Sequence, residues 1–88
     1  AADLPVVLAV ASSFRDSPVA DTLAAVGEVG LTGEIRAVSQ LEQRLHEIGR
    51  MGFTQCIVPR QGSDQLRPPA GLELLRVRNL REAIAVAL

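Results

Sequence analysis

Apolar and polar positions alternate along the chain with two periods, one typical of helices and one typical of strands. Between Asp3 and Phe14, apolar residues recur three and four positions apart, which predicts a helix that Asp3 caps. Two further helices are expected at the capping-box patterns Ser39-Gln40-Leu41-Glu42 and Asn79-Leu80-Arg81-Glu82. Shorter apolar runs predict strands over 23–31, 34–38, 55–59 and 72–77. The expected order is α-β-β-α-β-β-α, an α+β fold, and its strand-helix-strand middle predicts a parallel strand pair.

A glycine-marked hairpin is expected where the first two strands meet. Its ten residues are Gly27-Glu28-Val29-Gly30-Leu31-Thr32-Gly33-Glu34-Ile35-Arg36. Val29, Leu31 and Ile35 alternate with small or charged residues, as in half-buried strands. Gly33 provides the positive φ that a tight turn requires.

Composition limits the chain to one small domain without a strong charge signature. The 88 residues include only two aromatic residues, Phe14 and Phe53, so the core must be aliphatic. The net charge of −1 gives no overall nucleic-acid signature, although all nine basic residues are arginine. The single cysteine, Cys56, excludes an internal disulfide and is expected to be an inert core thiol. No run approaches the roughly 20 apolar residues of a membrane helix, so no membrane partner is expected.

The hairpin carries a family resemblance, together with two shorter motifs. With Ser13-Phe14-Arg15-Asp16 before it and Val58-Pro59-Arg60 after it, the hairpin resembles the C-terminal Lon-protease-like domain of the RadA (Sms) family of bacterial DNA-repair proteins. The likeness covers the whole chain, and Ala37 stands where the family often has proline. Active Lon proteases and magnesium-chelatase-like ComM proteins share similar hairpins, but the Ser-Phe-Arg-Asp motif argues against a ComM-type motor.

The resemblance implies a fold, a parent protein and a role. The fold is that of the second domain of ribosomal protein S5, with residues 1–88 as a single domain that lacks the N-terminal strands of complete Lon-like domains. The missing strands would leave a sheet edge open to another chain. The parent implied is a cytoplasmic, ATP-dependent repair and recombination protein that forms hexameric rings, drives branch migration, and uses ATP, magnesium and a structural zinc outside these residues. In it, the domain would be a scaffold that contacts single-stranded or branched DNA.

Catalysis by this chain itself is not expected. A Lon-class peptidase needs a serine and a lysine of lowered pKa, and the chain contains no lysine. In the resemblance, Glu42 takes the place of that lysine and Ala1 falls near the nucleophile. His46 and Cys56 are too few ligands for a structural zinc, so no catalytic, cofactor or metal residue is assigned. Glu28 and Glu34 could form an acid pair, but solvated charges are the favoured interpretation.

Arginines are the remaining candidates for a functional surface. Arginine pairs bidentately with phosphate, so a group near the central strand-helix-strand unit could contact DNA. The alternative for each is an ordinary soluble surface, since Glu42, Glu47 and Asp64 lie nearby in the sequence. Two rival functions also remain, an active Lon-class peptidase and a module that only oligomerises. The candidate DNA-binding residues are Arg36, Arg44, Arg50, Arg60 and Arg67.

Overall fold

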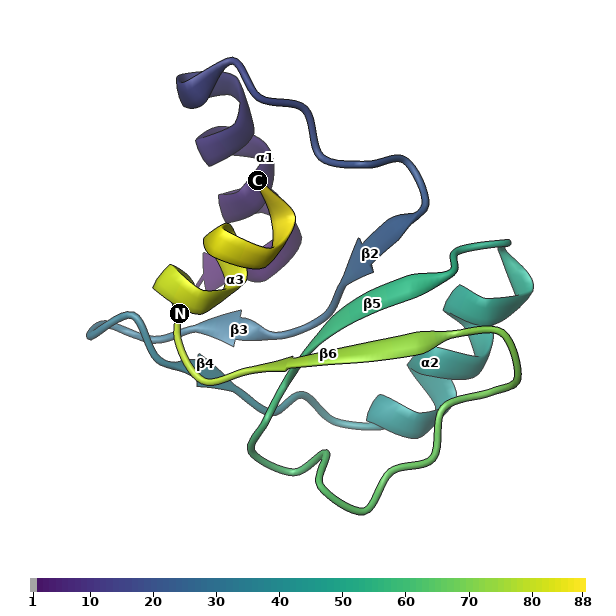
Figure 1. Ribbon diagram of the computed structural model, residues 1–88. Helices are drawn as coiled ribbons and strands as arrows, with labels where there is room; N and C mark the ends of the chain where they lie inside the picture. The colour runs from purple at the N-terminus through teal and green to yellow at the C-terminus, as the bar shows by residue number, and fades with distance from the viewer. Residues whose placement is uncertain (1) are drawn as a thin grey trace.

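Two small sheets organise the computed structural model, which describes residues 2–88. The antiparallel sheet has the order β1-β3-β4, and the parallel sheet has the order β2-β5-β6 (Figure 1). The antiparallel strands are β1 (Ala2–Asp3), β3 (Glu28–Val29) and β4 (Ile35–Arg36). The parallel strands are β2 (Leu23–Ala25), β5 (Gln55–Pro59) and β6 (Glu73–Val77).

Three helices cover the sheets and are α1 (Leu4–Arg15), α2 (Leu41–Arg50) and α3 (Leu80–Ala87). Helices α1 and α3 contact each other, and Figure 1 shows α2 on the other side of the parallel sheet. Alternate residues of β5 serve the two sides: Ile57 joins the core beneath α1 and α3, whereas Cys56 and Val58 join the core beneath α2. No helix within residues 2–88 has the length and apolar character needed to span a membrane.

The mixed α/β class is confirmed, but the predicted strand over 23–31 is wrong. The chain leaves β2 after Ala25 and enters the other sheet as β3 at Glu28. Val26 still donates its N–H to the Ile57 carbonyl at 2.9 Å. The next bond of a parallel ladder would come from the N–H of Pro59, which proline lacks. The ladder therefore ends there and the chain is free to change sheets.

Gly27 makes this change of sheet possible. Its φ is +153°, and a Cβ built at this position would lie 2.9 Å from Cγ2 of Ile35. Its carbonyl accepts the N–H of Leu4 at 3.0 Å, which fixes the start of α1 against the crossing. The crossing also explains why β5 pairs in parallel with β2 and not with the strand expected over 34–38, because β4 belongs to the antiparallel sheet.

The two predicted capping boxes have different outcomes. At α3, Oδ1 of Asn79 accepts the N–H of Glu82 at 2.9 Å, so the cap is confirmed, although the Glu82 carboxylate binds the N–H of Arg78 instead of Asn79. At α2 the prediction is wrong. Gln40 takes the N-cap position in a left-handed conformation, with a φ of 55°, and its side chain makes no capping hydrogen bond. Ser39 therefore lies one residue too early to cap the helix.

Helix α1 forms where expected, but its apolar stripe is only partly buried. Leu4 and Leu8 are buried, whereas Phe14 is 91% exposed and its predicted place in the stripe is wrong. The buried residues of α1 all lie in its first two turns, so its last turn extends beyond the core (Figure 1). Asp16, with a φ of 52°, ends the helix in a left-handed conformation two residues before Pro18.

Candidate nucleic-acid interface

The five predicted arginines differ in what they already bind, and two of them are in ion pairs. Nη2 of Arg36 lies 2.8 Å from Oε2 of Glu34, and Nη1 of Arg50 lies 3.7 Å from Oε1 of Glu47. The Thr32 hydroxyl and the Arg36 guanidinium donate to the Glu34 carboxylate and lower the pKa of Glu34 from 4.5 to about 2. These two arginines are therefore partly neutralised.

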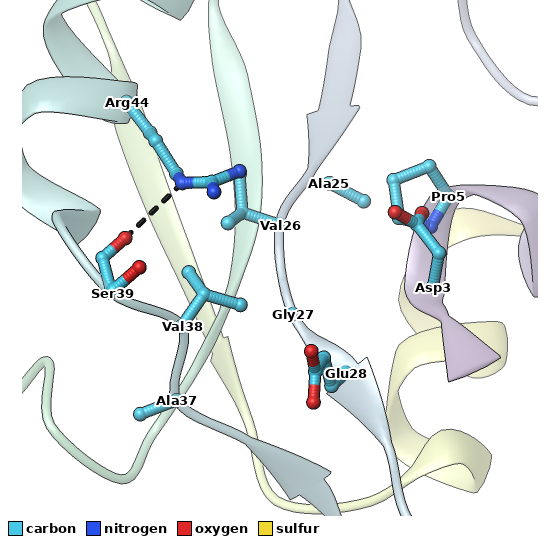
Figure 2. A pocket seen from close by; sticks show the side chains of 10 residues that line it. All are labelled: Asp3, Pro5, Ala25, Val26, Gly27, Glu28, Ala37, Val38, Ser39 and Arg44. Atoms are coloured by element: carbon cyan, nitrogen blue, oxygen red, sulfur yellow. Dashed lines mark hydrogen bonds between the residues drawn. The ribbon is translucent and has the colours of Figure 1, made fainter. Parts of the chain in front are cut away.

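Arg44 lies over a cavity of about 290 Å³ between the start of α1, the crossing from β2 to β3, and the segment that follows β4 (Figure 2). Its Nε donates to the Ser39 carbonyl at 3.1 Å. Asp3 and Glu28 line the same cavity, so a phosphate there would meet two carboxylates beside one guanidinium. One guanidinium beside two carboxylates leaves the lining of this cavity with a negative formal charge, which disfavours DNA contact at Arg44.

Glu28 and Glu34 do not face each other. Glu28 is opposite Arg36 in the ladder between β3 and β4. Glu34 lies at the turn, where its carbonyl accepts the N–H of Gly30 at 2.8 Å. The two acids therefore have separate surroundings, Glu28 at the cavity and Glu34 at the turn.

Arg60 and Arg67 are exposed, and neither has a carboxylate within 4.0 Å in the described part of the chain. Arg67 lies in the loop between β5 and β6. Arg76 fixes that loop, because its guanidinium donates to the Ser63 carbonyl at 3.1 and 3.2 Å and to the Leu66 carbonyl at 3.2 Å. Arg76 is thus committed to the fold, whereas Arg60 and Arg67 can bind other groups.

The structure adds three arginines that the sequence analysis did not select. Arg78 lines a hollow of about 300 Å³ together with Arg60, Glu34 and Asp64. Arg81 lines a neighbouring hollow of about 280 Å³ with Thr32 and Gly33, and a third of about 430 Å³ with Arg15. Within residues 2–88 none of these arginines has a carboxylate within 4.0 Å. We call the four residues that follow these hollows the arginine row: Arg15, Arg60, Arg78 and Arg81.

Two sequence features could have identified members of the row. Arg15 belongs to the Ser-Phe-Arg-Asp motif, and Arg78 follows β6 directly, two residues after Arg76. Strand alternation alone does not reveal that Arg76 is used internally while Arg78 is exposed. Nor does it reveal that the N–H of Arg60 donates to the Val77 carbonyl at 2.8 Å, the contact that holds Arg60 beside Arg78.

The other candidate residues are not arranged for catalysis or metal binding. Cys56 is fully buried, and burial raises the pKa of its thiol from 9.0 to about 12. His46 and Glu42 are exposed on α2, and Glu42 is not part of a capping box. Ala1, predicted near a nucleophile's place, lies outside the described residues. Across residues 2–88, histidine, cysteine and acidic side chains nowhere gather in a group of three or more that could hold a metal ion.

Comparison with known proteins places the chain in a family. Residues 1–62 match a family described as "Subunit ChlI of Mg-chelatase". Over 88 residues, 100% of this chain, it is 44% identical to the DNA repair protein RadA of Bacillus subtilis and 40% identical to that of Listeria monocytogenes, covering 19% of each relative. It is 47% identical over the same length to RadA of Synechocystis sp., covering 17% of it. The chain thus spans about a fifth of the length of the curated relatives it matches. The chain therefore belongs to the family described as subunit ChlI of Mg-chelatase, and its resemblance to the DNA repair protein RadA is confirmed.

Proposed function

We propose that this chain is a DNA-contacting scaffold of a RadA-type repair and recombination protein and has no peptidase activity of its own. The observation that carries the proposal is the arginine row, four exposed guanidinium groups without an acidic partner within 4.0 Å among the described residues. Unpaired guanidinium groups suit the phosphate backbone, because they pair with phosphate oxygens in a bidentate geometry. The printed names of the relatives supply the process, DNA repair.

The arginine row changes the set of candidate DNA-binding residues. Arg60 is kept and is joined by Arg15, Arg78 and Arg81, whereas Arg67 is a second, separate candidate in the loop after β5. Arg36 and Arg50 are in ion pairs, and Arg44 is the one guanidinium in a cavity with two carboxylates. The hollow of Arg60 and Arg78 also contains Glu34 and Asp64, but Glu34 is already paired with Arg36. Aromatic side chains for base stacking are scarce, so the row is expected to hold DNA through its phosphates.

The parent protein is proposed from the same relatives. It would be a cytoplasmic ATPase that uses magnesium and a structural zinc, forms hexameric rings and drives branch migration on single-stranded or branched DNA. Within residues 2–88, no three or more histidine, cysteine and acidic side chains gather in a group that could hold a metal ion, so the zinc and magnesium sites would lie elsewhere in the parent. In such a ring the domain would follow the fold of the second domain of ribosomal protein S5.

Two rival functions make different predictions. A Lon-class peptidase would degrade casein, but the sequence has no lysine to activate a serine, and arginine stays protonated and cannot replace it. A module that only oligomerises would leave DNA affinity unchanged when the row is neutralised. A peptidase gives no reason for unpaired arginines on adjoining hollows, whereas an oligomerisation module would pair them with acids of another copy, so the neutralised variants separate that rival from DNA contact.

DNA-stimulated ATP hydrolysis tests the proposal in a full-length RadA-type protein, with and without the region that corresponds to residues 1–88. We expect loss of DNA stimulation with ring assembly intact if the domain supplies DNA contact to the motor. Loss of the ring itself would identify the domain as a scaffold for the ring. If deletion changes neither, the proposed function is wrong.

A further inference from the structure

The turn between β3 and β4 carries an apolar side chain in an unusual position. Leu31 is 97% exposed, more than any other large apolar residue of the described chain, although strand alternation predicted that it would be half-buried. The turn projects from the body of the molecule, at the left edge of Figure 1. The Leu31 side chain gains no burial in this fold and is therefore free to contact another molecule.

The turn that holds Leu31 is rigid. The N–H of Gly30 donates to the Glu34 carbonyl at 2.8 Å, and the N–H of Gly33 donates to the Gly30 carbonyl at 3.1 Å. The Glu34 carboxylate also accepts both the N–H of Thr32, at 3.1 Å, and its hydroxyl, at 2.5 Å. Finally, the Gly33 carbonyl accepts the N–H of Leu80 at 2.8 Å, which ties the turn to the start of α3.

Positive charge flanks this turn. Thr32 and Gly33, the two residues that follow Leu31, line a hollow with Arg81. On the other side, the N–H of Ile35 donates to the Arg78 carbonyl at 2.9 Å, so Arg78 lies beside the base of the hairpin. Glu34, the acid within the turn, is paired with Arg36, and the Glu82 carboxylate accepts the backbone N–H of Arg78 at 2.7 Å. A strand of nucleic acid held by Arg78 and Arg81 would therefore pass beside the turn that carries Leu31.

We propose that Leu31 is a wedge that inserts between stacked bases at a junction of single- and double-stranded DNA. Apolar side chains inserted at base steps unstack them, and the cost is repaid by phosphate contacts around the wedge. Here the hydrogen bonds of the turn hold the wedge in place, and Arg78 and Arg81 supply the phosphate contacts. This inference rests on the proposed DNA contact and adds to it a means of opening a junction.

The test uses a forked DNA with the fluorescent base 2-aminopurine at the last pair before the junction. Unstacking raises the fluorescence of this base, and anisotropy of an end-labelled fork reports affinity separately. At saturating protein, we expect the wild-type chain to raise the fluorescence and Leu31→Ala to lose at least half of that rise. The dissociation constant of Leu31→Ala should change by less than about threefold, because the phosphate contacts supply most of the affinity. Leu31→Phe, which keeps an apolar wedge, should retain the rise.

Two controls separate the wedge from the proposed function. Met51→Ala removes another exposed apolar side chain, 71% exposed after α2, and should leave both signals unchanged. Arg78→Gln with Arg81→Gln should weaken affinity but retain the fluorescence rise at saturation. Tight binding without a rise, or an equal rise from Leu31→Ala, would overturn the wedge and leave DNA contact standing. Absence of binding by the wild-type chain would overturn both, and a change of oligomeric state in Leu31→Ala would assign Leu31 to a contact between copies instead.

Discussion

Replacement of Gly27 by alanine should destabilise the chain strongly, because the backbone conformation and the space around this residue both disfavour a side chain. The backbone at Gly27 has a φ of +153°, and the new Cβ would lie 2.9 Å from Cγ2 of Ile35 and 3.4 Å from Cγ of Pro59. The unfavourable backbone costs about 1–3 kcal/mol, and overpacking of a buried site costs about 1–3 kcal/mol. The expected loss is therefore about 2–6 kcal/mol, out of about 4–13 kcal/mol for 88 residues at roughly 0.05–0.15 kcal/mol each.

Gly52→Ala is the matched control for this prediction. Gly52 also has a positive φ, +95°, but no atom lies within 4 Å of a Cβ built there, so only the backbone cost applies. Urea unfolding followed by far-ultraviolet circular dichroism measures both variants. We predict that Gly27→Ala loses at least about 1 kcal/mol more of the free energy of unfolding than Gly52→Ala. Equal losses would refute the claim that the change of sheet requires close approach at this residue.

Three further predictions concern the turn, the thiol and the core. The carboxylate of Glu34 has a lowered pKa, so its contribution to stability is present above about pH 4.5 and is lost as the pH falls toward about 2. The free energy of unfolding of Glu34→Gln should therefore depend less on pH over that range. The thiol of Cys56 should stay unreactive toward an aromatic disulfide reagent at pH 8 until urea unfolds the chain, and fast labelling of the native chain would contradict its burial. Leu45→Ala, at 1% exposure, should cost about 3 kcal/mol in urea unfolding, whereas Met51→Ala on the surface should cost less than about 0.5 kcal/mol.

The local elements could be predicted where one period or one cap decides the structure. The strand over 55–59 and the cap at Asn79 follow from a short apolar run and from a side chain that reaches the N–H of Glu82. The change of sheet after Ala25 could not be predicted from the strand pattern, because it depends on Pro59, which is far away in sequence. Apolar alternation continues through Val26 and gives no sign that the hydrogen-bond partner changes.

The candidate DNA-binding surface could be predicted only in part from the sequence, for a similar reason. Composition identified arginine as the informative residue type, but the sequence does not show which guanidinium groups the fold already uses. Arg76 holds a loop and Arg36 binds Glu34, whereas Arg78 and Arg60 remain exposed side by side. Exposure of Leu31 was likewise hidden, because an apolar residue in an alternating run predicts burial.

The salt dependence of DNA affinity tests the central claim, that the arginine row contacts DNA. Fluorescence anisotropy with a labelled single strand, from about 50 to about 200 mM salt, gives the slope of log affinity against log salt, and each lost phosphate contact lowers its magnitude by about 0.7. We predict that Arg60→Gln with Arg78→Gln lowers the slope by about 1.4, while Arg50→Gln, which removes an arginine paired with Glu47, leaves it unchanged. Equal slopes for the wild-type chain and the double variant would contradict the account.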